Sequence, residues 1–267
     1  MVREFPRAGF LSTLLVPMAL ELRVTRFTHR YAQTTALHDV SLVVPAGSLV
    51  ALVGESGSGK TTLLRAFNRT IEPSAASVFV DGRDVTTVDP VELRRSIGYV
   101  PQSGGLLPHW TVGRNVALVP TLTQQADPER AARQALELCG LSPTTFLNRY
   151  PHELSGGQRQ RVAIARALAA QQGAVLLDES FSALDAISRS EVLDAFASIR
   201  AELGFTAVLV THDLSEAVRL ADTIGVMRAG RIEQMGTLHD LAENSASPYV
   251  ASLVERARTS ALLLADA

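Results

Sequence analysis

Three apolar runs mark the centre of the predicted fold. Leu49–Val53, Ala174–Leu177 and Thr206–Val210 consist almost entirely of aliphatic residues, which is typical of parallel strands that are buried on both faces. The last two runs are separated by Ser188–Leu203, a stretch whose length and composition predict a helix. Strands and helices that alternate in this way predict an α/β fold built on a parallel sheet.

Shorter patterns extend this core towards both ends of the chain. Further strands are predicted at Leu22–Tyr31, Val40–Val44, Ser77–Val80, Ile97–Val100, Ile224–Met227 and Arg231–Gln234. Asp89-Pro90-Val91-Glu92 combines the cap residue, the proline and the acid of a helix start. Two short helices are expected to finish the chain, and Tyr249–Leu262 is expected to be an amphipathic helix packed back on the domain.

Between Ser103 and Gln160 the pattern changes, and helices predominate. The candidate helices are Thr111–Val119, a segment from Asp127 to Gly140, and Gly156–Ala170. We therefore expect an α/β core that is interrupted by a helical subdomain at about residues 103–160.

Composition adds few constraints. The 267 residues are 46% hydrophobic, which is enough for a substantial core, and the net charge of −2 gives no indication of a nucleic-acid partner. Cys139 is the only cysteine and is expected to be a buried structural thiol. Residues 1–17 faintly resemble a signal peptide, but they lack a clear cleavage site, so we interpret them as a loose extension without a targeting function.

The stretch Val53–Thr62, with the sequence Val-Gly-Glu-Ser-Gly-Ser-Gly-Lys-Thr-Thr, lies between a predicted strand and a predicted helix. Glycines in such a loop allow backbone N–H groups to turn towards a phosphate, and the helix N-terminus adds a favourable dipole. Lys60 would reach the β- and γ-phosphates, and the Thr61 hydroxyl would bind Mg²⁺. A chance glycine turn is the alternative, but the flanking strand and helix favour a phosphate-binding P-loop.

Asp178 and Glu179 follow directly after the apolar run Ala174–Leu177. Acids at the carboxyl end of a buried strand face the ligand crevice of an open α/β sheet. Asp178 would hold Mg²⁺ through water, and Glu179 would polarise the water that attacks the phosphate. A pair of acids at a helix N-terminus is the alternative interpretation.

Leu154-Ser155-Gly156-Gly157-Gln158 opens another predicted helix. A serine hydroxyl, two glycine N–H groups and a helix N-terminus together form a second potential phosphate cradle. One triphosphate does not need two cradles from the same chain. The simplest explanation is that each cradle supplies half of a nucleotide site that two subunits share.

In this order, the P-loop, Leu154–Gln158 and Asp178-Glu179 resemble the nucleotide-binding subunit of ABC transporters, and the resemblance covers about residues 20–255. It implies a P-loop NTPase core with an N-terminal antiparallel β subdomain and an inserted α-helical subdomain. The expected divisions are an extension at 1–17, the ATPase domain at 18–255 and a tail at 256–267. The resemblance also implies a head-to-tail dimer, of this chain with itself or a homologous ATPase, that holds ATP between one P-loop and the other subunit's Ser155–Gln158.

The resemblance also implies individual roles. Tyr31 would stack on adenine, Gln102 would contact Mg²⁺ and water, and His212 would contact the γ-phosphate. Ordinary strand packing is the alternative for Tyr31, and helix capping is the alternative for His212. Ser180 stands where the family usually has proline, so this segment is expected to be slightly less rigid, with Glu179 intact.

The expected site therefore comprises three sets of residues. The catalytic residues are Gln102, Glu179 and His212. The Mg²⁺ ligands are Thr61, Gln102 and Asp178. The nucleotide contacts are Tyr31, Gly54, Glu55, Ser56, Gly57, Ser58, Gly59, Lys60, Thr61, Thr62, Ser155, Gly156, Gly157, Gln158 and the D-loop residue Asp185.

Four further stretches, Phe67–Pro73, Asp89–Arg95, Asn115–Pro120 and Arg149–Leu154, resemble the osmoprotectant branch of these importers. That branch takes up glycine betaine, choline, carnitine or proline betaine. The resemblance implies an ATP-hydrolysing subunit on the cytoplasmic face of the membrane, bound to an integral-membrane permease and served indirectly by a solute-binding protein. Trp110 is expected either at the permease contact or in the packing of the helical subdomain.

Three alternatives remain open for the function. The chain would then drive an importer for amino acids or similar solutes, belong to an exporter or lipoprotein extractor, or be a soluble ABC ATPase without a transport role. Only 20 residues follow Ser247, so we do not expect regulation by the pair of CBS sensor domains that the osmoprotectant branch often carries.

Overall fold

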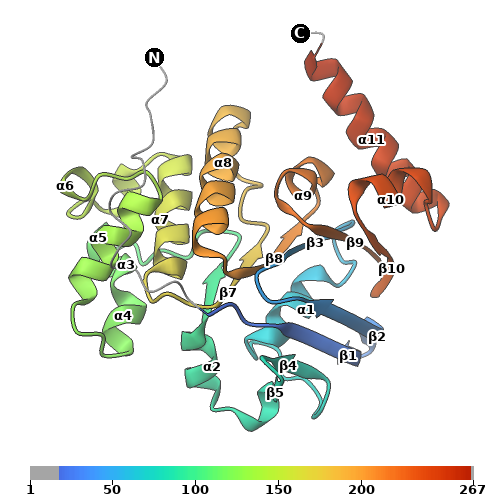
Figure 1. Ribbon diagram of the computed structural model, residues 1–267, viewed down its shortest axis with the longest axis horizontal. Helices are drawn as coiled ribbons and strands as arrows, with labels where there is room; N and C mark the ends of the chain where they lie inside the picture. The colour runs from blue at the N-terminus through green and yellow to red at the C-terminus, as the bar shows by residue number, and fades with distance from the viewer. Residues whose placement is uncertain (1–17, 266–267) are drawn as a thin grey trace.

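A six-stranded sheet forms the centre of the fold in the computed structural model, which describes residues 18–265 (Figure 1). The strand order is β10-β9-β3-β8-β7-β6, and all neighbours run parallel except β9 and β10. The bounds are β3 Leu49–Val53, β6 Ile97–Val100, β7 Ala174–Asp178, β8 Thr206–Thr211, β9 Thr223–Arg228 and β10 Arg231–Gly236. The predicted apolar runs are confirmed as its central strands, and the extension at 1–17 lies outside the described residues.

The central strands are buried on both faces, as their continuous apolar sequences require. In β3, Leu49, Ala51 and Val53 pack into one hydrophobic cluster, together with α7, α8 and the helical subdomain. Val50 and Leu52 pack into a second cluster, which also contains α1 and the smaller sheet. Because side chains alternate along a strand, β3 joins the two cores of the molecule.

The smaller sheet is antiparallel and has the order β2-β1-β4-β5, with β1 Leu22–Tyr31, β2 Thr34–Val44, β4 Val78–Val80 and β5 Arg83–Asp84. It confirms the expected N-terminal antiparallel subdomain. β2 begins at Thr34, six residues before the predicted strand at Val40–Val44. The first residues of β2 pair with the end of β1 across irregular registers, and these shifts hide the alternation of polar and apolar residues.

The helical subdomain contains α3 Val112–Val116, α4 Leu118–Leu122, α5 Pro128–Leu138, α6 Pro143–Phe146 and the start of α7 Gly156–Leu168, on the left in Figure 1. The prediction of one helix over Thr111–Val119 is wrong, because two short helices meet at Ala117. Pro120 has no N–H to donate to the carbonyl of Val116, so a single helix cannot continue through this point. The prediction of a buried Cys139 is confirmed, and burial raises the pKa of its thiol to about 12.

Aspartate caps begin several helices at the places where the sequence predicts them. Asp89 accepts hydrogen bonds from the N–H groups of Val91 and Glu92 at the start of α2 Pro90–Ser96. Asp127 caps α5 in the same way. The remaining elements are the helices α1 Lys60–Phe67, α8 Ala186–Leu203, α9 Leu214–Leu220 and α10 Leu238–Glu243, with 3-10 turns at Val85–Thr87 and Pro151–Glu153.

The chain ends in α11, which runs from Pro248 to Ala265 and is longer than the short helix that we predicted. Its first turns pack on the domain, where Tyr249, Val250 and Val254 are buried. Figure 1 shows the later turns extending away from the domain, so the expected packing holds only for the first part of the helix. Among the described residues, no helix is both long and apolar enough to cross a bilayer.

Candidate nucleotide-binding site

The P-loop connects β3 to α1, at the carboxyl edge of the central sheet. Gly59 caps the helix with a φ of 102° and without a side-chain hydrogen bond. A Cβ at this position would lie 2.7 Å from the carbonyl oxygen of Ala36 in β2, so both the backbone conformation and the close packing require glycine. The first N–H groups of α1 are left without a side-chain cap, which suits them to bind an anion.

Lys60 is folded back against its own loop. Its Nζ donates to the carbonyl oxygens of Gly54 (2.7 Å) and Glu55 (2.9 Å), and the side chain is almost completely buried. Burial lowers the pKa of Lys60, while the nearby carboxylates of Glu179 and Asp178 act in the opposite direction. The ammonium group is therefore held at the P-loop by charge-assisted hydrogen bonds to carbonyl oxygens, whose places phosphate oxygens could take.

Asp178 ends β7 and faces the first turn of α1. Its carboxylate accepts hydrogen bonds from the Thr61 hydroxyl (2.8 Å), the Tyr99 hydroxyl (3.0 Å) and the Arg65 guanidinium (3.2 Å). The side chain is only 3% exposed. A carboxylate and a hydroxyl in contact at the edge of a phosphate loop are the hard oxygen donors that Mg²⁺ takes beside substrate phosphates, so these residues fit the expected ion.

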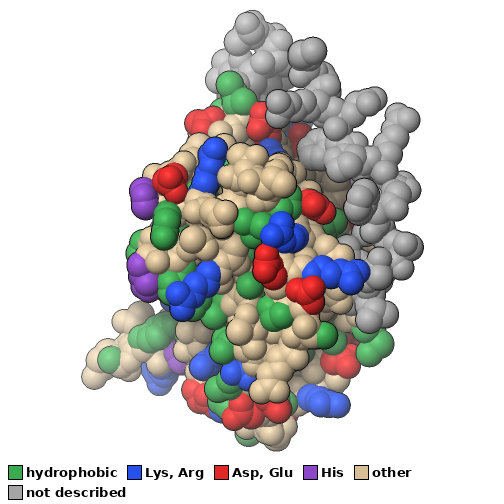
Figure 2. All heavy atoms as spheres, turned by 90° about the vertical axis from the view of Figure 1, so that its left-hand side faces the viewer, with side chains coloured by type: hydrophobic (Ala, Val, Ile, Leu, Met, Phe, Trp, Pro, Cys, Tyr) green, Lys and Arg blue, Asp and Glu red, His purple; other side chains and the backbone are tan. Residues whose placement is uncertain are grey.

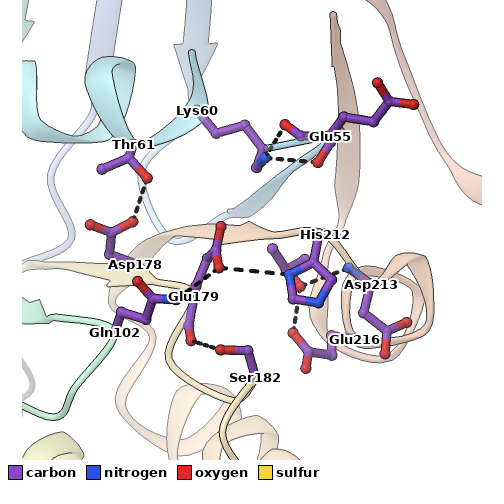
Figure 3. Close-up of polar contacts among 12 residues, drawn as sticks. Glu55, Lys60, Thr61, Gln102, Asp178, Glu179, Ser182, His212, Asp213 and Glu216 are labelled. Carbon is purple, nitrogen blue, oxygen red and sulfur yellow. Dashed lines mark hydrogen bonds and ion pairs between the residues drawn. The ribbon is translucent and has the colours of Figure 1, made fainter. Parts of the chain in front are cut away.

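Glu179, Gln102 and His212 meet beside the P-loop, although they come from three different segments (Figure 3). Gln102 Nε2 donates to Glu179 Oε2 at 3.1 Å, and His212 Nδ1 lies 3.7 Å from the same oxygen. Glu179 adopts a φ of 47°, a left-handed conformation that is costly for a non-glycine residue and is often found at functional sites. The carboxylate is thus aimed into the space in front of Lys60 and Thr61.

The loop that carries His212 is held by its neighbours. Asp213 caps α9 by accepting from the N–H of Ser215, which assigns the capping role to Asp213 and leaves His212 half exposed beside Glu179. The hydroxyl of Thr211 donates to Glu216 at 2.6 Å. Burial raises the pKa of Glu216, while this hydrogen bond acts to lower it.

Ser155 to Gln158 form the N-terminus of α7, away from the P-loop. Ser155 Oγ accepts from the N–H of Gln158, and the Gln158 side chain accepts from the N–H of Ser155, which makes a capping box. The Ser155 hydroxyl proton stays available for a ligand. A Cβ at Gly156 would lie 3.6 Å from the Leu184 side chain, so this turn faces the loop that precedes α8.

Tyr31 and Asp185, two of the other predicted contacts, lie on β1 and at the start of α8. Tyr31 is 50% exposed at the end of β1, with its ring edge-on to that of His29 at 4.7 Å. Asp185 accepts from the N–H of Ser188 and caps α8. That cap explains why α8 begins at Ala186, two residues before the predicted start.

A protein-family model described as ABC transporter matches residues 37–182. The chain belongs to the ABC transporter family. This confirms the family and the ABC ATPase fold expected from the sequence.

Curated relatives and solved structures agree with this assignment. The glycine betaine/carnitine/choline transport ATP-binding protein OpuCA of Bacillus subtilis is 44% identical over 84% of this chain, which spans 59% of that relative's length. The sulfate/thiosulfate import ATP-binding protein CysA of Mycobacterium tuberculosis is 44% identical over 89% of this chain and 67% of its own length. The dimeric ABC transporter cassette MJ0796 superposes with a TM-score of 0.73 at 32% identity, covering 81% of this chain and 98% of that structure.

The structure brings most of the predicted site residues together and leaves others apart. Lys60, Thr61, Gln102, Asp178, Glu179 and His212 surround one space at the carboxyl edge of the sheet. Ser155–Gln158 contribute to another surface of the same chain. Within one chain, the P-loop and the Ser155–Gln158 turn therefore belong to separate surfaces.

Sequence reasoning missed several residues that hold this site. Arg65 lies four residues after Thr61, on the same face of α1, and that spacing could have indicated it. Tyr99 could be found only through the strand order, since β6 and β7 are neighbours in the sheet. Tyr249 lies outside every nucleotide-binding motif, yet its hydroxyl accepts from the N–H of Glu55 at 3.1 Å, although the two residues are 194 positions apart in sequence.

Proposed function

We propose that this chain is the ATP-hydrolysing subunit of an ABC importer for an osmoprotectant or quaternary amine. The observation that carries the proposal is the position of Glu179, between Gln102 and His212 and in front of the P-loop. An acid held there, beside Lys60 and Thr61, has the position required of a group that orients water for attack on a γ-phosphate.

Hydrolysis would proceed by in-line displacement. Glu179 would orient the water and take up its proton as the new oxygen–phosphorus bond forms and the bond to the bridging oxygen breaks. Lys60 would move from its own loop carbonyls to the phosphates, and His212 would contact the γ-phosphate. Thr61, Asp178 and Gln102 would hold Mg²⁺, which supplies charge neutralisation at the phosphates when it is bound.

A second subunit would complete the site. Ser155–Gln158 present a hydroxyl group and a helix N-terminus on a surface apart from the P-loop of the same chain. A head-to-tail dimer with a second copy, or with a homologous ATPase, would place Ser155–Gln158 of each subunit (the signature turn) over the partner's ATP. ATP binding would then close the dimer, and hydrolysis would open it again.

The helical subdomain is the proposed contact with an integral-membrane permease. It carries a groove of about 600 Å³, lined by residues of α3–α6 that include Thr111, Arg114, Glu129 and Leu147. Figure 2 shows this side of the molecule, where acidic, basic and hydrophobic side chains are intermixed. Trp110 is partly buried under the Arg114 guanidinium, 3.9 Å from its ring centre, which favours packing over permease contact for that residue. The chain would thus be peripheral, on the cytoplasmic face of the membrane, and a solute-binding protein would act only indirectly.

The choice of an osmoprotectant rests on likeness. The resemblance of four sequence stretches and the 44% identity to the betaine, carnitine and choline relative support it. The sulfate relative has the same percentage of identity, so an importer for another solute is the second candidate. A soluble ABC ATPase without a transport role has less support, since both of these relatives are transport proteins by name.

Uptake of labelled glycine betaine, choline and proline tests the proposal, in a strain that lacks this gene, with and without osmotic upshift. Wild-type protein should restore uptake, and Glu179→Gln should not. If deletion leaves the uptake of all three solutes unchanged but reduces sulfate uptake, the second candidate is correct. If the tagged protein co-purifies with ribosomes or an assembly scaffold in place of a permease, the transport function is wrong.

A further inference from the structure

Arg189, in the first turn of α8, contacts two loops of the site that are remote in sequence. Its Nη2 donates to the backbone carbonyl of Leu184 at 2.9 Å, in the predicted D-loop Ser182–Asp185 that precedes α8. Its Nη1 lies 3.5 Å from the carboxylate of Asp213, and its Nε lies 3.7 Å from that of Glu216. One planar guanidinium thus joins the D-loop to the segment that follows His212.

On the His212 side, the contact continues through a buried acid. The Glu216 side chain is 2% exposed, and its second oxygen accepts from the hydroxyl of Thr211 at 2.6 Å. Thr211 Oγ1 also accepts from the N–H of Asp213 at 3.0 Å. These bonds flank His212 on both sides, so the position of Glu216 determines where the loop presents the imidazole.

On the D-loop side, the contact continues to Glu179 and to the signature turn. Ser182 donates to the carbonyl oxygen of Glu179 through its hydroxyl, at 2.9 Å, and also through its N–H. Figure 3 shows Ser182 directly beneath Glu179, with Glu216 beside His212. The Leu184 side chain faces Gly156 in the signature turn, where an added Cβ would lie 3.6 Å from it.

We propose that Arg189 is a positioning residue that couples the two ATP sites of the dimer. The inference rests on the proposed head-to-tail dimer, in which the signature turn of one subunit covers the ATP of the other. A displacement of that turn on nucleotide binding passes through Leu184 to Arg189, and from Arg189 through Glu216 and Thr211 to His212 of the same subunit. Each subunit therefore adjusts its own hydrolytic groups to the occupancy of its partner's site.

The rate of ATP hydrolysis as a function of ATP concentration tests this coupling. For wild-type protein we expect a Hill coefficient between about 1 and 2, the number of sites in the dimer, and clearly above 1. Arg189→Ala should reduce it to about 1 and lower the maximal rate roughly tenfold. The affinity of the separated subunit for a fluorescent ATP analogue should stay within about twofold, because Arg189 does not face the P-loop.

Arg219→Ala is the matched control. Arg219 also bridges α8 and α9, through Asp194 and Ser190, but it does not reach the D-loop or the His212 loop. This variant should keep the wild-type Hill coefficient. Arg189→Lys should restore little of the coupling, since one ammonium group cannot serve a carbonyl and two carboxylates in the planar arrangement of the guanidinium.

Glu216→Gln provides a second approach if Arg189→Ala does not fold. It preserves the shape and an acceptor for Thr211 but removes the charge that faces Arg189, and it too should lower the Hill coefficient. Cooperative hydrolysis in both folded variants, or an equal loss in Arg219→Ala, would overturn the inference, as would wild-type hydrolysis without cooperativity. A wild-type chain that neither dimerises with ATP nor hydrolyses it would instead contradict the proposed function.

Discussion

The hydrogen bond between Tyr249 and the P-loop predicts a defined energetic link between α11 and the nucleotide site. The Tyr249 hydroxyl accepts from the N–H of Glu55, and the residue is 8% exposed, with the Arg228 guanidinium 4.8 Å from the ring centre. Tyr249→Phe removes only the hydrogen bond, whereas Tyr249→Ala removes the packing of the ring as well. The pair of variants therefore separates the two contributions.

The expected magnitudes follow from this geometry. A partly buried amide hydrogen bond contributes about 0.5–1.5 kcal/mol to the free energy of unfolding, so Tyr249→Phe should cost that amount. Loss of the buried ring in Tyr249→Ala should cost about 3–5 kcal/mol. Because the bond holds the P-loop, its removal should weaken the free energy of ATP binding by up to the same ~0.5–1.5 kcal/mol. This corresponds to a roughly two- to twelvefold weaker Kd in Tyr249→Phe.

Urea unfolding and titration with a fluorescent ATP analogue measure the two effects. The Phe variant should unfold with an unchanged denaturant slope, which would show that the folded and unfolded states remain comparable. An unfolding free energy and an ATP affinity both equal to wild type in Tyr249→Phe would refute the reasoning. Equal unfolding free energies for Tyr249→Phe and Tyr249→Ala would also refute it, because the buried ring would then make no contribution of its own to stability.

Three further predictions concern the site itself. Glu179→Gln should lower ATP turnover by about 10²–10⁴-fold while trapping a dimer with bound ATP, as seen by gel filtration, and near wild-type turnover would exclude Glu179 as the group that activates water. Ser155→Arg should abolish hydrolysis without weakening ATP binding by the separated subunit, and normal turnover would argue against a shared site. Ser180→Ala should cost about 1 kcal/mol of unfolding free energy, because the buried Ser180 hydroxyl donates to the carbonyl of Val100. Ser198→Ala, at an exposed serine, is the control. Equal losses of stability in the two variants would show that the Ser180 hydrogen bond does not contribute.

The fold was predictable from sequence where the hydrophobic pattern had one interpretation. The central strands are continuously apolar because both their faces are buried, and the aspartate caps identify helix starts within two residues. The pattern failed at Thr34–Asp39, where the strand has irregular pairing, and at Pro120, where a missing N–H divides a helix. Cap residues and hydrophobic periodicity indicate the bonds within one helix or strand. They do not indicate which distant segment that helix or strand pairs with.

The same distinction applies to the site. Lys60, Thr61 and Asp178 belong to motifs whose spacing carries their chemistry, so their position could be predicted. Arg189 and Tyr249 act through contacts with segments far away in sequence, and neither lies in a motif that indicates a nucleotide. Their contribution became visible only when the fold placed α8 and α11 beside the loops.

The close packing of Gly59 on Ala36 also sets the distance between the β1–β2 hairpin and the P-loop. Ala36 belongs to β2, which forms a hairpin with the strand that ends at Tyr31, and a Cβ on Gly230 would meet the same Ala36 carbonyl. The distance from Tyr31, the residue expected to stack on adenine, to the P-loop thus depends on these backbone contacts, which leave no room for an added methyl group. The β1–β2 hairpin and the P-loop are therefore expected to hold the base and the triphosphate at a set separation. A larger residue at Gly59 or Gly230 would shift the hairpin relative to the P-loop and so change that separation.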